Sequence, residues 1–309
     1  MRKILSALIC AAFLLQAGMG FAEEKGVAIV DSLGNTAVLH PNDRVVSCHA
    51  SLAQCWLLSG GTLAGVTEDA ISERGLDIAE GTQIIGTVKS IDMEALVSAE
   101  PDYVLLSADL TAHLELQQTL DQMGIQYGYY REDAFSDYAA IMQQFCLVND
   151  PTGSRYEEYV IQTQNRIQSV LDIVPTETDQ SQLLLRAFST GFKAKTDDNL
   201  AGQILKEFGL INIAEKTPSL LEDMSMEQIL LEDPDYIFVI TMGDEQAAKE
   251  YLLKNVENDP AWASLTAVQT GRYIVLPQYL FHYKPNNRWD ESYLYLARIL
   301  YPEVFEGEE

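Results

Sequence analysis

The chain has 309 residues and carries 46 acidic against 20 basic side chains, which gives a formal net charge of −26. A polyanion of this size is repelled by nucleic acids and by anionic membrane surfaces, so the composition argues against partners of both kinds. Hydrophobic residues make up 47% of the chain, which is typical of a globular protein with enough apolar side chains for two domain cores.

Residues 1–22 read MRKILSALICAAFLLQAGMGFA and predict a signal peptide. A basic start precedes a short apolar run, and Gly20-Phe21-Ala22 provides the small-x-small pattern of a cleavage site. We expect cleavage after Ala22 and secretion across the cytoplasmic membrane, to a periplasmic or cell-surface location; an uncleaved signal that acts as an anchor stays open. Bulky Ile9 before Cys10 disfavours lipid attachment at that cysteine.

Residues 23–150 alternate between short apolar runs and helical patterns. Residues 23–43 predict an added hairpin or extension. After it we expect strands at 44–47, 63–66, 83–85, 104–106 and 125–130, and helices at 51–58 and 110–123. Strands that alternate with helices predict βαβ units around a parallel sheet, so residues 44–150 are interpreted as an N-terminal lobe.

The chain contains an internal repeat. SIDMEALVSAEPDYVLLS at residues 90–107 aligns with DMSMEQILLEDPDYIFVI at residues 223–240, with Pro101 and Pro234 in the same register. Each copy reads as a short helix, a turn at the proline and a strand covered on both faces, because proline cannot continue a helix and an uninterrupted apolar run suits a buried strand. The repeat predicts two lobes of the same design.

A single long helix is expected between the lobes. Residues 151–175 repeat apolar side chains at helical spacing, and Pro175 ends the pattern. About 20 residues at a rise of 1.5 Å make a stiff rod of about 30 Å. The C-terminal lobe, residues 176–309, is expected to hold strands at 183–188, 237–241 and 273–276 and helices at 199–208, 245–255 and 290–300.

Three cysteines follow the predicted signal. We interpret Cys48, Cys55 and Cys146 as small apolar residues, and a Cys48–Cys55 bridge stays open. Their spacing matches no zinc-finger pattern. Cys48, near a helix start, is the candidate for a reactive thiol.

In order and spacing, these segments resemble the periplasmic-binding family for ferric siderophores and cobalamin, from about Arg44 to Phe305. The motifs that carry the resemblance are RVVSCHASLAQCWLLSGG, LAGVT, IIGTVKSIDMEALVSAEPDYVLLS, the linking helix, SMEQILLEDPDYIFVI, GRYIVLP and LYPEVF. The family's usual Gly-Gly after the third strand appears here as Gly86-Thr87. The resemblance implies an α/β protein with two Rossmann-like lobes, each with a central parallel sheet, bridged by one long helix.

The resemblance also implies a function and a partner. The chain is expected to capture a ferric chelate such as a siderophore, cobalamin or a similar ligand for an ABC importer, as a monomer with no intrinsic cofactor. In the family, one glutamate at the start of each repeated helix docks on the transmembrane permease dimer, which works with a cytoplasmic ATPase. Glu94 and Glu227 occupy those positions. An acid in the first turn also stabilises its own helix dipole.

Candidate ligand contacts follow the strands, because ligands of open α/β sheets bind beyond the carboxyl ends of the strands. Residues 189–195 and 279–289 are expected to be loops of this kind, and the second combines aromatic and basic side chains that suit a flat or chelated anion. The predicted cleft residues are His49, Ser51, Lys89, His113, Lys193, Lys195, Tyr279, His282, Tyr283 and Arg288.

Two alternatives use the histidines directly. His49, His113 and His282 each follow an expected strand and, with Asp69 or Asp109, offer a ligand set for zinc or manganese. Ligation of haem by one of the histidines is the other alternative. An enzyme is not expected, because the sequence contains no G-x-S-x-G, phosphate-loop or HExxH motif.

Overall fold

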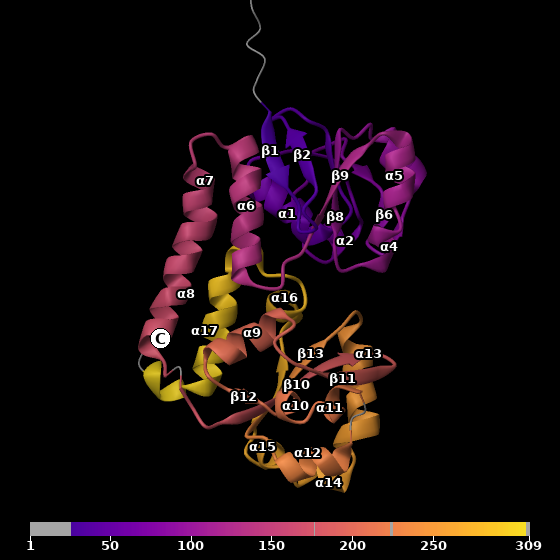
Figure 1. Ribbon diagram of the computed structural model, residues 1–309. Helices are drawn as coiled ribbons and strands as arrows, with labels where there is room; N and C mark the ends of the chain where they lie inside the picture. The colour runs from indigo at the N-terminus through magenta and orange to yellow at the C-terminus, as the bar shows by residue number, and fades with distance from the viewer. Residues whose placement is uncertain (1–25, 176, 223–224, 307–309) are drawn as a thin grey trace, which may run out of the picture.

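The computed structural model describes residues 26–175, 177–222 and 225–306. The predicted signal peptide, its cleavage site and Cys10 lie outside these residues. Two α/β lobes lie one above the other, and long helices run along one side of both (Figure 1). Each lobe has its own sheet, as the repeat predicts.

The N-lobe is built on a five-stranded parallel sheet with the order β5-β4-β3-β8-β9. Its strands are β3 (Val45–Ser47), β4 (Leu63–Val66), β5 (Gln83–Ile84), β8 (Tyr103–Ser107) and β9 (Gln126–Tyr130). Its helices are α1 (Ala50–Leu58), α2 (Asp69–Ser72), α3 (Met93–Ser98), α4 (Thr111–Leu114), α5 (Gln117–Met123) and α6 (Phe135–Asn149). The central strands β3 and β8 are buried throughout, as their uninterrupted apolar runs require. The one helix expected over 110–123 is divided into α4 and α5.

Two small hairpins are attached to the N-lobe. The predicted N-terminal hairpin consists of β1 (Val27–Val30) and β2 (Thr36–Leu39). Buried Asp31 joins it to the lobe, because its carboxylate accepts a hydrogen bond of 2.9 Å from the backbone N–H of Tyr129. The second hairpin, β6 (Gly86–Thr87) and β7 (Ser90–Ile91), carries Lys89 at its turn.

The C-lobe sheet has the order β11-β10-β13-β14, with β12 also paired to β10. Its strands are β10 (Ser181–Phe188), β11 (Gly191–Lys195), β12 (Ile211–Asn212), β13 (Tyr236–Thr241) and β14 (Tyr273–Leu276). Its helical segments are α9 (Leu200–Glu207), α10 (Ile213–Lys216), α11 (Ser219–Glu222), α12 (Met226–Glu232), α13 (Glu245–Leu252), a π-helical turn (Leu253–Glu257), α14 (Pro260–Ala263), α15 (Thr266–Gln269), α16 (Gln278–Phe281), α17 (Trp289–Leu300) and the 3₁₀ turns Asn286–Arg288 and Pro302–Val304. The expected loop at 189–195 is wrong in part, because residues 191–195 form β11 and pair antiparallel with β10.

The two copies of the repeat make the same contact. Asp102 accepts a hydrogen bond of 2.8 Å from the backbone N–H of Arg44, just before β3. Asp235 accepts one of 2.8 Å from the backbone N–H of Ser181, at the start of β10. The aspartate of each Pro-Asp-Tyr segment therefore fixes the start of the neighbouring strand, so the matching sequences specify matching structures.

The helix that links the lobes runs from residue 154 to residue 173. It consists of α7 (Ser154–Tyr156), a π-helical turn (Glu157–Ile161) and α8 (Gln162–Ile173). Its buried side chains include Val160, Ile167 and Val170, and an ion pair between Arg166 and Asp290 joins α8 to α17. The expected single long helix is thus present, with one π turn within it.

Candidate functional site

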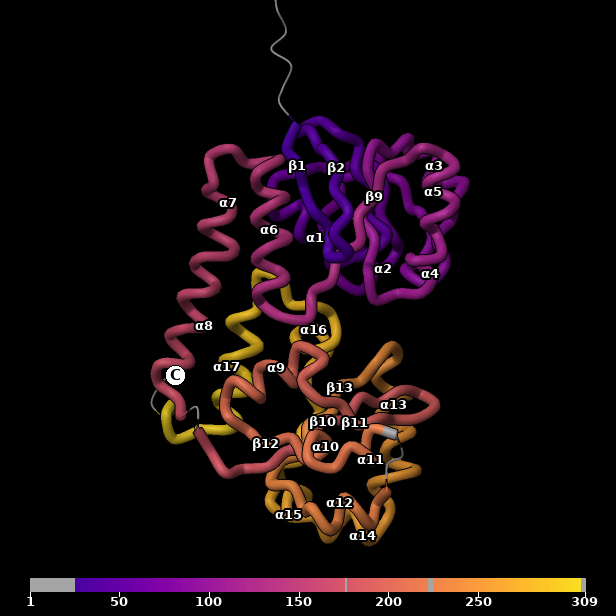
Figure 2. Tube along the Cα trace, viewed as in Figure 1, coloured from indigo at the N-terminus to yellow at the C-terminus, as the bar shows by residue number. Residues whose placement is uncertain are grey.

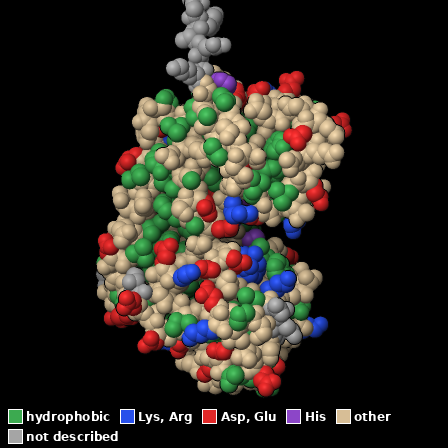
Figure 3. Space-filling view, in the orientation of Figure 1, with side chains coloured by type: hydrophobic (Ala, Val, Ile, Leu, Met, Phe, Trp, Pro, Cys, Tyr) green, Lys and Arg blue, Asp and Glu red, His purple; other side chains and the backbone are tan. Residues whose placement is uncertain are grey.

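A cavity of about 370 Å³ lies between the two lobes, beyond the carboxyl ends of β8, β9 and β13. The molecule is hollowed at this level, and Lys and Arg side chains gather beside the hollow (Figure 3). The N-lobe side of the lining consists of His49, Leu52, Ser107, Asp109, Leu110, Tyr130, Glu132 and Asp133. The C-terminal half of the chain contributes Arg186, Lys195, Asp198, Asn199, Leu200, Met242, Phe281, His282 and Lys284. A solute in this cavity would contact both lobes.

Three of the predicted cleft residues line this cavity, namely His49, Lys195 and His282. The pKa of His49 is lowered to about 3 and that of His282 to about 4, mainly by burial and in part by nearby cations, Arg74 for His49 and Arg186 for His282. Both imidazoles are therefore neutral at pH 7. The Nδ1 atom of His49 is buried and has no hydrogen-bond partner in the described part of the chain.

Ser51 and His113 are internal residues rather than cavity residues. The Ser51 hydroxyl, in a side chain that is 1% exposed, contacts Glu132 Oε2 at 2.6 Å and Asn286 Oδ1 at 2.9 Å. The ring of His113 is fully buried: Nδ1 accepts a hydrogen bond of 2.9 Å from the backbone N–H of Ser107, and Nε2 lies 2.9 Å from the carbonyl oxygen of Val88. The position after a strand was correct for both, but their side chains face the protein interior.

Lys89 and Lys193 are exposed and lie outside the cavity lining. Lys193 belongs to the edge strand β11, and Lys89 occupies the turn of the β6–β7 hairpin. Lys89 still contributes to the lowered pKa of His282, so its charge reaches the cavity. Position after a strand does not determine which way a side chain points, so ligand contact by Lys89 and Lys193 stays a prediction.

The aromatic and basic cluster at 279–289 is only partly directed at the cavity. Arg288 stacks on the Tyr279 ring at 4.8 Å and pairs with Glu291 at 2.6 Å. The Tyr283 hydroxyl donates a hydrogen bond of 3.3 Å to Gln278 Oε1. The contacts of these three side chains are thus with residues of the same segment and the start of α17. None of Tyr279, Tyr283 and Arg288 lines the cavity.

Arg186 is the most informative residue that sequence reasoning missed. Its Nε is buried and has no hydrogen-bond partner among the described residues. Its charge contributes to lowering the pKa of both Asp198 and His282, so the guanidinium lies near both side chains. The signal was present as one arginine inside the apolar strand run of residues 183–188.

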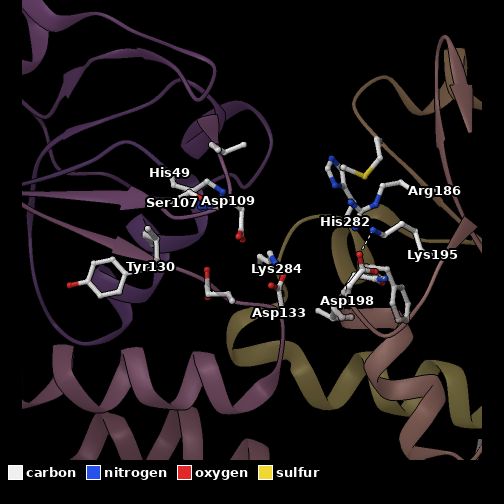
Figure 4. A pocket seen from close by; sticks show the side chains of 17 residues that line it. His49, Ser107, Asp109, Tyr130, Asp133, Arg186, Lys195, Asp198, His282 and Lys284 are labelled. Atoms are coloured by element: carbon white, nitrogen blue, oxygen red, sulfur yellow. Dashed lines mark hydrogen bonds and ion pairs between the residues drawn. The ribbon is translucent and has the colours of Figure 1, made fainter. Parts of the chain in front are cut away.

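The start of α9 shapes the same wall. The Asn199 side chain caps the helix by accepting a hydrogen bond of 3.2 Å from the backbone N–H of Gly202. A Cβ at Gly202 would lie 2.0 Å from the carbonyl oxygen of Thr196, so glycine permits this close approach. The resulting turn holds Asp198 in an ion pair with Lys195 (Figure 4).

The N-lobe wall carries three carboxylates. Asp109 pairs with Arg131 at 2.7 Å, and Asp133 pairs with Lys284 at 2.8 Å. Glu132 is 3% exposed, and its oxygens accept hydrogen bonds from Ser51 at 2.6 Å and from Cys55 Sγ at 3.5 Å. Sequence reasoning considered Asp109 alone of these three, although residues 131–133 directly follow β9.

The predicted metal triad of His49, His113 and His282 is not assembled. The rings of His49 and His113 are 6.4 Å apart, but both nitrogens of His113 already contact the backbone. Within residues 26–175, 177–222 and 225–306, no three or more His, Cys, Asp or Glu side chains are placed to hold a metal ion.

The three described cysteines are free and buried, so the Cys48–Cys55 bridge is not formed. Burial raises the pKa of Cys146 to about 11 and that of Cys48 far above its ordinary value. Cys48 is therefore a protonated core thiol rather than a reactive one, in agreement with its interpretation as a small apolar residue.

The two predicted docking residues lie far from the cavity. Glu94 and Glu227 are exposed in the first turns of α3 and α12, which begin at the N-caps Asp92 and Ser225. Figure 2 shows α3 on the upper lobe and α12 at the far end of the lower lobe. In the part of the chain that the structure describes, no helix has the length and hydrophobicity to cross a membrane.

Comparisons with known proteins agree with this architecture. A family model described as "Periplasmic binding protein" matches residues 45–280. The Fe(3+)-citrate-binding protein YfmC of Bacillus subtilis is 22% identical over 262 residues, which cover 82% of this chain and 80% of the relative. The Fe(3+) dicitrate-binding periplasmic protein FecB of Escherichia coli is 23% identical over 250 residues, which cover 78% and 79%.

Solved structures show the same fold. Staphylococcus aureus IsdE, complexed with heme, superposes with a TM-score of 0.67 at 18% identity and covers 84% of this chain and 99% of that chain. Staphylococcus aureus SirA, complexed with staphyloferrin B, gives a TM-score of 0.65 at 17% identity and covers 90% and 98%. The predicted class of fold, two α/β lobes bridged by a long helix, is confirmed.

Proposed function

Since the chain belongs to the periplasmic binding protein family, we propose that it is the solute-binding component of an ABC importer and that its solute is an iron chelate. The protein works outside the cytoplasmic membrane, captures the chelate between its lobes and delivers it to the permease. Glu94 and Glu227, one on each lobe, are the docking residues for the two halves of the permease. Support comes from the match over residues 45–280 and from relatives that are named for ferric citrate.

The observation that carries this proposal is the Arg186 side chain, whose buried Nε has no hydrogen-bond partner among the described residues, in a cavity shared by both lobes. A buried polar group without a partner costs free energy, so its retention is explained when a ligand supplies the missing acceptor. Carboxylate and hydroxamate oxygens are acceptors of this kind, and arginine binds carboxylates through charge-assisted hydrogen bonds. Lys195 and Lys284 add positive charge to the same cavity.

The test is a thermal-shift panel of ferric citrate, ferrioxamine B, haem and cobalamin, followed by calorimetry on the compounds that raise Tm. At least one ferric chelate is expected to bind, and Arg186→Gln should weaken binding of ferric citrate about tenfold or more. The control is Glu157→Gln, which also changes the net charge by one unit but lies on the linking helix. It should leave the affinity unchanged. Absence of binding by every ferric chelate would contradict the proposal.

Haem is a second candidate, because His282 and Met242 line the same cavity. Imidazole and thioether are both haem-iron ligands, and the lowered pKa of His282 keeps its ring neutral and available. The imidazole Nε2 accepts a long hydrogen bond of 3.5 Å from the backbone N–H of Gly243. Haem binding predicts a shifted Soret band that His282→Ala removes; an unchanged spectrum in that variant would reject this candidate.

A further inference from the structure

The two walls of the cavity carry opposite charges. Figure 4 shows Asp109 on the N-lobe side, Asp133 beside Lys284 in the middle, and Arg186 and Lys195 on the opposite side. The acidic wall also contains Glu132, and no lysine or arginine of the N-lobe lines the cavity among the described residues. Asp109 is paired with Arg131 at 2.7 Å and Asp133 with Lys284 at 2.8 Å, so Glu132 is the carboxylate of this wall that has no ion pair among the described residues.

The ion pairs inside the protein leave part of this separation uncompensated. Lys195 is paired with Asp198, the one acidic residue of the C-lobe among the described lining residues, whereas Arg186 has no ion pair among them. On the N-lobe side, Glu132 is hydrogen-bonded to uncharged groups, Ser51 and Cys55, at 2.6 Å and 3.5 Å. Glu132 and Arg186 are therefore the charges with the greatest need of a ligand.

Arg74 is the cation that compensates Glu132 in part. Burial lowers the pKa of Arg74, and the charge of Glu132 acts in the opposite direction, so the two groups interact. No ion pair within 4.0 Å joins them among the described residues, and the Arg74 guanidinium donates to Gln54 and to the carbonyl oxygen of Lys284. The Glu132 carboxylate thus keeps capacity for a donor from the ligand.

A ligand of one charge sign fits such a cavity poorly. Repulsion between the ligand and one wall offsets much of the attraction to the other wall, because charges interact strongly in a partly buried cavity. A ligand with an anionic end and a cationic or hydroxyl-bearing end gains at both walls. The same arrangement aligns the ligand across the cleft and contributes to specificity.

We infer that the cavity selects a chelate of mixed charge, with a carboxylate toward Arg186 and an ammonium or hydroxyl donor toward Glu132. This inference rests on the proposed function and defines its substrate class more narrowly. It distinguishes this site from one built for a purely anionic chelate, where cations would line both lobes.

The test uses two ferric citrate derivatives of matched size. In one, a carboxyl group of citrate is converted to its 2-aminoethyl amide, which carries an ammonium; in the other, it is converted to the propyl amide, which is uncharged. The wild-type protein is expected to bind the aminoethyl amide about fivefold more tightly than the propyl amide in calorimetry. The preference should disappear in Glu132→Gln, whereas Glu157→Gln, the same substitution on the linking helix, should retain it.

Thermal unfolding of each variant shows that it is folded before its affinity is compared. Equal affinity of the wild-type protein for the two amides, or a preference that survives Glu132→Gln, would overturn the inference and leave the proposed function intact. Absence of binding by ferric citrate and by both amides would instead overturn the proposed function itself. A lower affinity for both amides in Arg186→Gln is expected, since that residue holds the carboxylate end in either compound.

Discussion

The two lobes share a repeated unit but differ where they meet the cavity. In both, the residue before the repeated proline has a left-handed backbone, Glu100 with φ 48° and Asp233 with φ 38°, and the following aspartate fixes a neighbouring strand. The N-lobe sheet is parallel throughout, whereas the C-lobe adds the antiparallel strand β11.

This comparison distinguishes the residues that hold the fold together from the residues that line the cavity. Positions that keep the fold, at the start of the strands, are the same in both lobes. Positions beyond the carboxyl ends of the strands have diverged into an acidic wall and a basic wall. The repeated fold therefore places two different surfaces on opposite sides of the cavity, where one ligand would contact both.

The largest expected effect is on the cores of the two lobes. Trp56 and Trp262 are 1% and 2% exposed, so replacement of either by alanine should lower the free energy of unfolding by about 3–5 kcal/mol.

Replacement by phenylalanine should have a different cost in each lobe. Trp56 Nε1 donates a hydrogen bond of 2.9 Å to the carbonyl oxygen of Thr62, whereas Trp262 Nε1 has no partner among the described residues. Trp56→Phe should cost about 1 kcal/mol more than Trp262→Phe in urea unfolding. Equal costs would contradict this assignment.

The pH dependence of stability is expected to report on His282. Its pKa is about 4 in the folded protein and about 6.5 when unfolded, so the unfolded chain takes up the proton first as the pH falls. The stabilisation is complete above pH 6.5 and is lost as the pH falls to 4 and below, by about 3 kcal/mol. His282→Gln should make the unfolding free energy less dependent on pH in this range. A profile as steep as that of the wild-type protein would contradict the assignment.

A smaller effect tests the symmetry of the repeat. Asp102→Ala and Asp235→Ala each remove the acceptor at the start of a strand, which should cost about 1 kcal/mol. Asp235 should cost more, because it also accepts a hydrogen bond of 3.0 Å from the Ser181 hydroxyl. Chemical denaturation of the two variants and of the double variant measures this, and a negligible loss in both would remove the structural role assigned to the repeat.

The smallest energies are expected at the docking residues. Exposed ion pairs contribute about 0.2–1 kcal/mol each, so Glu94→Lys or Glu227→Lys alone should reduce transport modestly, and the double variant should reduce it further. Uptake of the chelate by proteoliposomes that contain the permease measures this effect, with calorimetry as the control that chelate affinity is unchanged. Transport at the wild-type rate in the double variant would reject the docking role.

The sequence was sufficient to predict the fold but not the lining of the cavity. The repeat around Pro101 and Pro234, the apolar strands and the long helix are local patterns, and the structure confirms them. Side-chain direction depends on tertiary packing, which is why Ser51 and His113, correctly placed after strands, face the interior. Arg186 was recognisable as a charge inside an apolar strand, and Lys284 belongs to the predicted loop at 279–289 and lines the cavity beside its partner Asp133.

The central claim is that one solute is held by both lobes at once. Hydrogen–deuterium exchange with and without saturating ferric citrate tests it most directly. The account predicts slower exchange on both walls, at residues 107–110 and 130–133 of the N-lobe and at residues 184–188, 195–200 and 280–284 of the C-terminal half. Protection confined to one lobe, or located away from these segments while ferric citrate is bound, would contradict it.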